Sequence, residues 1–342
     1  MNKHAVALAF AAAALAVFGV PASAQDKTFD LKFSSWVPPA HALHVAVKEW
    51  GDSISKATKG TVKVTLYPSQ QLGKADDHYD MARDGIADVT YIALGYQAGR
   101  LPMGEAGNLP FLMTNADGGS MGLDSWYRKY HAKEMPDVMM CLAFVHDPGA
   151  LHSKKKITLP AEIKGMKIRS AHGTMADYVT AMGGTNVRVS APESRQALES
   201  GVADAITFPW KSIILFGIDK VVNHHMDEAF YVASFAWLIN KAKYGQMSPA
   251  QKKAIDAHCN TEWAGKVGRT WGAYEAAGRD EMRKLPGHTV YKLTPEQVAQ
   301  WRKAAEPVYK KWADTARKTG FDPDQALKEL RASLAKYNSE FK

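Results

Sequence analysis

One arginine stands at the predicted end of a short strand, a position suited to binding an anion. In the segment IKGMKIRSAHG, Gly165 breaks the chain, residues 166–168 run extended, and Arg169 comes where the next loop begins. A guanidinium group presents its donors in a planar fork that matches the two oxygens of a carboxylate. The other interpretation of an arginine at a strand end is a solvated surface charge. The segment alone does not decide between the two.

Residues that would indicate catalysis or metal binding are not arranged for either. The motif GGSMG fits G-x-S-x-G around Ser120, but a nucleophile elbow needs a strand that runs directly into that turn. Here TNADGG follows the apolar LPFLM, so we expect Ser120 at the start of a helix. His41 with His44, and His224 with His225, lack the neighbouring carboxylates or cysteines that complete a zinc site. We therefore predict no enzyme, no metal site and no cofactor.

The N-terminal residues have the three-part pattern of a secretory signal. Lys3 precedes an apolar run, residues 5–20, and the small residues that end at Ala24 form a cleavage site. We predict loss of residues 1–24, which leaves 342 − 24 = 318 residues in the periplasm with a net charge of 42 − 35 = +7. The basic residues are dispersed, so we expect no nucleic-acid partner. A mildly basic field favours anionic ligands.

The two cysteines, Cys141 and Cys259, have two interpretations. In an oxidising compartment they are able to pair. A core of this size does not need such a link, and free cysteine is among the residues most often buried. We therefore favour two separate buried cysteines over a disulfide.

Strand and helix patterns alternate through most of the chain. Alternating or continuous apolar runs predict strands, separated by helical stretches, and the pattern restarts after Leu151. From Ser248 onward nearly every segment is helical, with Ser248 as N-cap and Pro249 at the first helical position. This alternation predicts two mostly parallel sheets, and ligands of such folds bind in a crevice at the carboxyl ends of the strands. Arg169 lies at such an end. The principal predicted strands are residues 28–36, 61–68, 87–94, 166–170, 185–190 and 203–210.

A set of segments, in order along almost the whole predicted mature chain, carries a family resemblance. The chain resembles extracytoplasmic solute-binding proteins of tripartite ATP-independent periplasmic (TRAP) transporters, of the dicarboxylate-binding (DctP) type. The resemblance implies a partner, the membrane permease subunits, to which a small organic acid is delivered. The segments include SSWVPPAHALH, VTLYPSQQLGKADDHYDMARDGIADVTYI, GYQAGRLP, NLPFLM, IKGMKIRS, PESRQALESGVADA and LINKAKYGQMSPAQKKAID.

The resemblance also implies the architecture. We expect an α/β, bilobal, periplasmic-binding-protein-like (type II) fold with a cleft between two mostly parallel-sheet lobes and a long helix that spans both. The expected first lobe contains residues 25–147 and 234–275, and the second contains 148–233 and 276–342. The lobes should close about hinges near residues 147–149 and 233–235. We expect a monomer.

In this family the arginine of the G-x-K-[IL]-R stretch typically binds the carboxylate of the substrate, which assigns that role to Arg169. Two departures from the family pattern concern the rest of the substrate. Sialic-acid-binding members carry another arginine near the position of Gly149, where this chain has none. Phe208 replaces an asparagine that many members carry, and Trp210 follows it.

Aromatic residues at or near strand ends complete the predicted site, namely Trp36, Tyr96 and Phe235, with Trp237 close by. An aromatic wall in place of polar anchors favours a monocarboxylate with an aromatic or apolar tail, such as an aryl or alkyl 2-oxo or 2-hydroxy acid. A sugar acid would leave buried hydroxyls without partners. Two other functions remain open: a sensor that passes its ligand to a membrane receptor, and a periplasmic hydrolase that uses Ser120.

Overall fold

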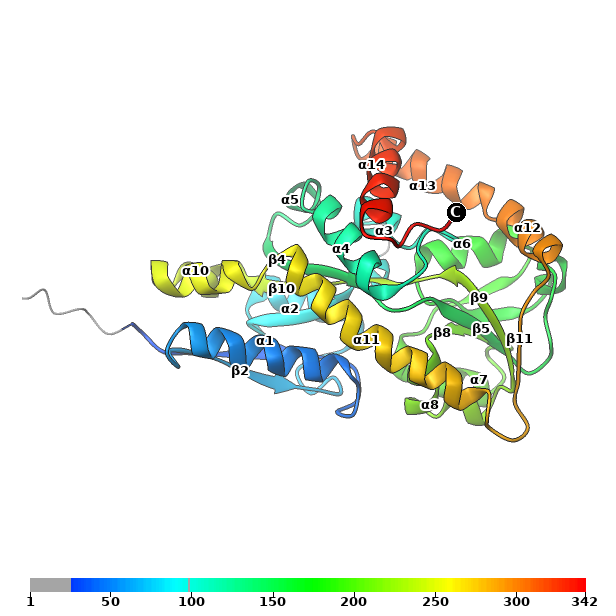
Figure 1. Cartoon of the computed structure of the whole chain (residues 1–342), viewed down its shortest axis with the longest axis horizontal. Coiled ribbons are helices and arrows are strands. Elements are labelled where there is room, and N and C mark those ends of the chain that lie inside the picture. The colour runs from blue at the N-terminus through cyan, green and yellow to red at the C-terminus, as the bar shows by residue number, and fades with distance from the viewer. Residues whose placement is uncertain (1–25, 98) are drawn as a thin grey trace, which may run out of the picture.

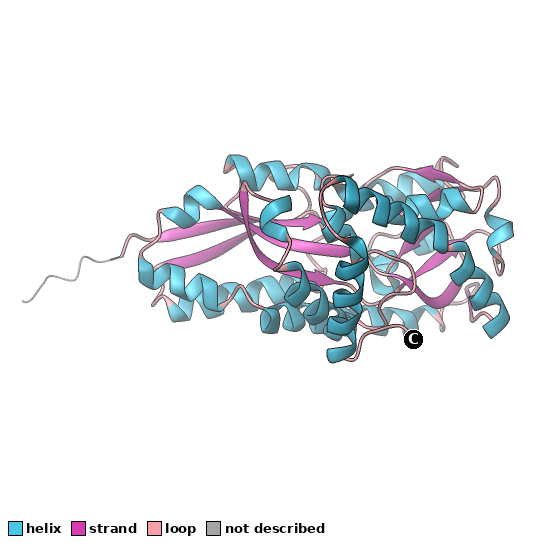
Figure 2. Ribbon diagram, turned by 90° about the horizontal axis from the view of Figure 1, so that it is seen from above, coloured by secondary structure: helices cyan, strands magenta, loops and turns pink. Residues whose placement is uncertain are grey.

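The computed structural model describes residues 26–97 and 99–342, so the predicted signal peptide lies outside the described residues. Two separate sheets, each covered by helices, organise this part of the chain (Figures 1 and 2). Within the same residues, no helix is both long and apolar enough to cross a membrane.

The first sheet has five strands in the order β2 (Val62–Tyr67), β1 (Phe29–Ser34), β3 (Val89–Ala93), β10 (Ser234–Asn240) and β4 (Val138–Val145). β1 runs parallel to β2 and to β3, whereas β10 runs antiparallel to both of its neighbours. Every residue of β3 and β10 is buried, as expected of strands covered on both faces.

The second sheet has six strands in the order β11 (Thr289–Tyr291), β9 (His224–Tyr231), β5 (Gly149–Ser153), β8 (Ala205–Phe208), β6 (Lys167–Arg169) and β7 (Thr185–Val187). Here β5 is antiparallel to both neighbours, while the β8–β6–β7 part and the β9–β11 pair are parallel. Arg169 is therefore the last residue of a strand in the parallel part, as the sequence predicted.

The antiparallel strand of each sheet is the one by which the chain enters from the other sheet. The chain leaves the first sheet through β4 and enters the second as β5, and it returns from β9 into β10. The connections are short, residues 146–148 and 232–233. This arrangement confirms the predicted fold class of two mostly parallel sheets, and it brings the ends of several strands to one place between them.

The long helix α11 (Thr261–Met282) packs against α1, α4 and α8 and so runs along elements of both sheets (Figure 1). Among the C-terminal helices, α13 contacts α3 and α6, and α14 packs on α4. The other helices are α1 (Leu43–Ala57), α2 (His78–Asp84), α3 (Pro102–Ala106), α4 (Ala116–Tyr127), α5 (His131–Glu134), α6 (Gly173–Ala181), α7 (Ser194–Glu199), α8 (Trp210–Leu215), α9 (Lys241–Gly245), α10 (Pro249–Ala257), α12 (Pro295–Ala304), α13 (Glu306–Lys318) and α14 (Pro323–Lys336), with short 3-10 turns η1 (Ala75–Asp77), η2 (Leu94–Tyr96), η3 (Pro160–Ile163), η4 (Ala191–Glu193) and η5 (Ile218–Lys220).

The helical stretch after Ser248 is divided into two helices. The Ser248 side chain caps α10 by accepting a hydrogen bond from the Gln251 N–H, which confirms the predicted N-cap. α10 ends at Ala257, and the Asn260 side chain then accepts from the Trp263 N–H and caps α11. A second N-cap inside the stretch therefore starts the long helix.

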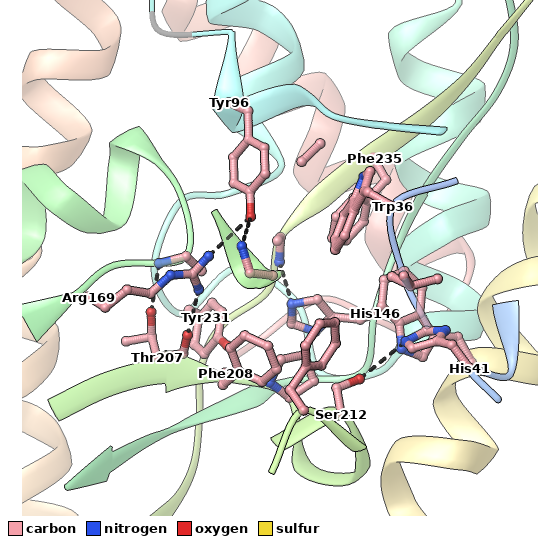
Figure 3. A pocket seen from close by; sticks show the side chains of 18 residues that line it. Trp36, His41, Tyr96, His146, Arg169, Thr207, Phe208, Ser212, Tyr231 and Phe235 are labelled. Carbon is pink, nitrogen blue, oxygen red and sulfur yellow. Dashed lines mark hydrogen bonds between the residues drawn. The ribbon is translucent and has the colours of Figure 1, made fainter. Parts of the chain in front are cut away.

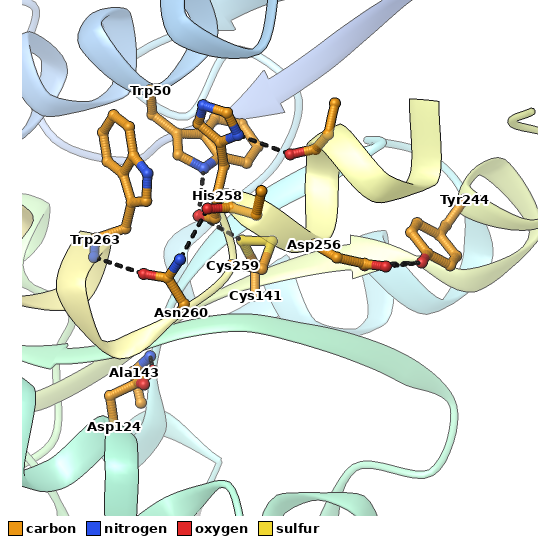
Figure 4. Close-up of a disulfide and its surroundings, with 12 residues drawn as sticks. Trp50, Asp124, Cys141, Ala143, Tyr244, Asp256, His258, Cys259, Asn260 and Trp263 are labelled. Carbon is orange, nitrogen blue, oxygen red and sulfur yellow. Dashed lines mark hydrogen bonds between the residues drawn. A yellow bond between two sulfur atoms is a disulfide. The ribbon is translucent and has the colours of Figure 1, made fainter. Parts of the chain in front are cut away.

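The prediction of two separate cysteines was wrong, because Cys141 and Cys259 form a disulfide (Figure 4). Cys141 lies on β4, at the edge of the first sheet, and Cys259 lies in the turn between α10 and α11. The Trp50 indole N–H donates to the His258 carbonyl at 3.0 Å and holds this turn against α1. The packing of the turn on an edge strand, which no local pattern encodes, brings the two sulfurs together.

Removal of this disulfide should destabilise the protein. The bond closes a loop of 118 residues, and a link of that span restricts the unfolded chain strongly. Replacement of both cysteines by alanine should lower the free energy of unfolding by about 2–5 kcal/mol. Urea unfolding measures this loss, and wild-type protein kept reduced should lose stability in the same direction. Equal unfolding midpoints for variant and wild type would contradict the expectation.

Candidate functional site

A cavity of about 40 Å³ lies between the two sheets (Figure 3). Its lining comes from both: Trp36, Tyr96 and Phe235 belong to or follow strands of the first sheet, and Arg169 and Phe208 end strands of the second. Most of the other lining residues are apolar or aromatic. They include Val37, Ala93, Ala171, Ala191, Pro209, Phe216, Tyr231, Ala233 and Trp271.

Arg169 is the cation of this cavity, and it is almost completely buried, with an exposed fraction of 2%. Its Nε donates to the Val189 carbonyl at 3.1 Å, and Nη1 donates to the Thr207 carbonyl at 3.4 Å. Its Nη2 donates to the Tyr96 hydroxyl at 3.1 Å. All three acceptors are neutral, and among the described residues no carboxylate lies within 4.0 Å of the guanidinium nitrogens.

A buried charge without a counter-ion is costly, and an anion that enters the cavity relieves that cost. Arginine carries five N–H donors, of which the three hydrogen bonds use one on each nitrogen. One N–H therefore remains on each terminal nitrogen of Arg169. Two parallel donors on neighbouring nitrogens match the two oxygens of a carboxylate.

Tyr96 connects the two sides of the site. It ends η2, directly after β3 of the first sheet, and its hydroxyl oxygen accepts from Arg169 and from the Ala191 N–H at 3.0 Å. Both donors belong to the side of the second sheet. Because the oxygen already accepts two hydrogen bonds, the phenolic proton is available for a third partner.

Aromatic rings in tilted and edge contacts build the apolar wall. Phe235 on β10 lies with its ring centroid 5.0 Å from that of Trp271 on α11. The Arg169 guanidinium carbon is 5.5 Å from the centre of the Phe208 ring, which in turn makes an edge contact with Phe216. A ligand carboxylate at Arg169 would thus have aromatic surface next to it.

Trp210 does not line the cavity, contrary to the prediction. β8 ends at Phe208, and Trp210 is already the first residue of α8, so the turn at Pro209 redirects its side chain. Its indole packs against the His152 ring, with centroids 5.3 Å apart, and under the guanidinium of Arg279 at 5.5 Å. The other predicted site residues all line the cavity, namely Arg169, Phe208, Trp36, Tyr96 and Phe235.

Two histidines, which the sequence did not indicate as ligand contacts, also line the cavity. His41 accepts from the Leu43 N–H through Nδ1 and bonds the Ser212 hydroxyl through Nε2 at 3.2 Å, and burial lowers its pKa to about 3. Burial also lowers the pKa of His146, to about 4. Both rings are therefore neutral near pH 7 and add no positive charge. No group of three or more potential metal ligands occurs within residues 26–97 and 99–342.

A buried carboxylate anchors one wall of the cavity. Glu275 on α11 accepts from the hydroxyl and the N–H of Ser212 on α8, at 2.5 and 3.1 Å, and from the Trp271 indole at 2.7 Å. Burial raises the pKa of the Glu275 carboxyl. Since His41 also contacts Ser212, one hydrogen-bonded chain joins the start of α1 to α8 and α11. Long sequence separations explain why no motif revealed it.

Ser120 lies inside α4 with an exposed fraction of 0%. Its hydroxyl accepts from the Val145 N–H at 3.0 Å and donates to the Val145 carbonyl at 3.4 Å. A serine held in this way has no access to a substrate. The structure therefore gives the hydrolase hypothesis no support.

Comparison with protein families agrees with this geometry. Residues 33–315 match the family of bacterial extracellular solute-binding proteins, family 7 (DctP). The chain belongs to this family, whose structurally similar members are TRAP solute-binding proteins.

Three solved structures with about 30% identity carry aromatic acids. A TRAP solute-binding protein of Rhodoferax ferrireducens with copurified benzoate is 29% identical, with a TM-score of 0.86 over 91% of this chain and 99% of that one. One from Bordetella bronchiseptica with bound (R)- and (S)-mandelate is 30% identical, with a TM-score of 0.84 over 90% and 99%. One from a marine metagenome with 3-hydroxybenzoate is 30% identical, with a TM-score of 0.86 over 91% and 99%.

His172, a buried histidine at the start of α6, gives the stability a pH dependence. Its Nδ1 caps α6 by accepting from the Met175 N–H, its Nε2 donates to the Val232 carbonyl at 3.0 Å, and burial lowers its pKa to about 3. The folded state therefore keeps this ring neutral at pH values at which the unfolded chain, with a pKa near 6.5, binds a proton. Stability contributed in this way is lost as the pH falls below about 6.5.

A His172→Asn variant, which retains an N-cap acceptor, isolates this effect. Between pH 7 and pH 5 the wild type should lose about 2 kcal/mol more unfolding free energy than the variant. Urea unfolding at both pH values measures the difference. The same loss in both proteins would show that His172 does not titrate as described.

Proposed function

We propose that this protein is a periplasmic solute-binding protein that captures an aromatic or apolar-tailed monocarboxylate and delivers it to a TRAP permease without chemical turnover. The observation that carries this proposal is the buried guanidinium of Arg169, which lacks a carboxylate partner in the described structure and borders an aromatic cavity. A carboxylate ligand supplies the missing charge, and its ring or alkyl group fills the apolar part.

The polar inventory of the lining supports a single carboxylate. Arg169 is the one lysine or arginine among the lining residues that the structure describes, so a second carboxylate would be buried without a counter-ion. His41 and Ser212 are already bonded to each other and to neighbours. A sugar acid would bring several hydroxyls to a wall with few free partners, and an unpaired buried hydroxyl costs about 1–3 kcal/mol.

Relatives with benzoate, mandelate and 3-hydroxybenzoate support the same class of ligand. Each of these acids combines one carboxylate with one ring. Aromatic stacking adds about 0.5–1.5 kcal/mol to the burial of such a ring. The preferred substrates are therefore aryl acids and aryl 2-oxo or 2-hydroxy acids.

We also propose that residues 25–147 with 234–275, and 148–233 with 276–342, act as two lobes that close over the ligand. The short crossings at residues 146–148 and 232–233 are placed to act as hinges. The hydrogen bond from Ala191 to Tyr96 joins the two proposed lobes, as expected of a closed conformation.

A thermal-shift screen of purified protein tests the function. Benzoate, phenylacetate, mandelate and benzoylformate should raise the melting temperature, because ligand at about 100 times its dissociation constant adds roughly 2.7 kcal/mol of stability. Benzamide is the matched control: it has the ring of benzoate without the charge and should have no effect. If succinate or hexuronates stabilise the protein while the four aryl acids do not, the proposed substrate class is wrong.

A further inference from the structure

The phenol of Tyr231 is a buried polar group without a partner. Tyr231 ends β9, lines the cavity, and has an exposed fraction of 2%. Within the described part of the chain its hydroxyl makes no hydrogen bond. Figure 3 shows Tyr231 beside Arg169 and Phe208. Because buried hydroxyls are normally paired, we expect the hydrogen-bond partner of this hydroxyl to be a bound molecule.

A glycine on the neighbouring strand makes the position of this phenol possible. Gly149 pairs with Tyr231 across β5 and β9. A Cβ atom at residue 149 would lie 2.5 Å from the Tyr231 hydroxyl oxygen and 2.6 Å from the ring carbon that carries it. Any other residue at this position would therefore displace the ring.

The sheet order explains how Tyr231 reaches the site from a distance. Arg169 ends β6, whereas Tyr231 ends β9, and β8 and β5 stand between them. Adjacent strands are about 4.8 Å apart, so the two backbones are separated by roughly three such spacings. The missing side chain at Gly149 leaves the space in which the phenol extends over β5 towards the same cavity.

We propose that the Tyr231 hydroxyl donates a hydrogen bond to an oxygen of the bound acid, and that Gly149 is required to keep the phenol in place. The inference rests on the proposed function, because it assigns the partner of this hydroxyl to the carboxylate ligand. The acceptor is either a carboxylate oxygen or an oxygen on the adjacent carbon of a 2-hydroxy or 2-oxo acid.

The chemistry of the group fits a donor. Burial raises the pKa of Tyr231 well above its usual value, with a smaller opposing effect of Arg169, so the hydroxyl keeps its proton at physiological pH. A neutral O–H beside a guanidinium complements an anionic oxygen in the same way as the remaining N–H groups of Arg169. Together they would form a three-donor cradle.

The test is Tyr231→Phe, which removes one oxygen atom and retains the ring. Titration calorimetry with benzoate, mandelate and benzoylformate should show about tenfold weaker binding. If binding of all three acids is weakened, the hydrogen bond is to the carboxylate. If only mandelate and benzoylformate bind more weakly, the hydrogen bond is to the oxygen on the adjacent carbon. Gly149→Ala should weaken binding at least as much.

Tyr91→Phe is the matched control. The Tyr91 hydroxyl is also buried and unpaired among the described residues, but Tyr91 does not line the cavity. This variant should bind within twofold of wild type, and the melting temperatures of the ligand-free variants check their folding. If the wild type binds the acids and Tyr231→Phe binds them with the same affinities, this inference alone is overturned. A wild type that binds none of the three acids overturns the proposed function and the inference with it.

Discussion

The structure depends on one buried positive charge that forms no ion pair within the described residues. Arg169 is held by two main-chain carbonyls and one phenol, and the part of the chain that the structure describes offers it no carboxylate within ion-pair distance. Such an arrangement is unfavourable in the absence of an anion and favourable in its presence. Stability of the cavity and affinity for an acid are therefore two consequences of the same interaction.

The remainder of the fold places apolar surface next to this charge. Two crossings between the sheets bring the ends of β3, β6, β8, β9 and β10 to one region, and each end contributes a lining residue. Glu275 fixes the start of α8 from the long helix, so the wall that faces the ligand is attached to the element that runs along both sheets. The proposed specificity for an aryl acid follows from this combination of one fork of donors and several rings.

Local patterns in the sequence were sufficient for the fold class, for the position of Arg169 and for most of the aromatic wall, because strand ends of a parallel sheet meet at one edge. They failed where a residue's surroundings come from distant segments. Trp210 turns away because a helix starts there, and the cysteines pair because a turn packs on an edge strand. The role of Tyr231 depends on the absence of a side chain at Gly149, which only the register of β5 and β9 reveals.

The affinity of Arg169 variants for benzoate is the most direct test of the central claim. Calorimetry should show at least a hundredfold loss for Arg169→Ala, equivalent to about 3 kcal/mol or more, because the carboxylate would be buried without its partner. Arg169→Lys should also bind poorly, since an ammonium group cannot reproduce the planar fork. Arg269→Ala, which removes an exposed arginine outside the cavity, should leave the affinity unchanged. Near wild-type affinity of Arg169→Ala would contradict the account.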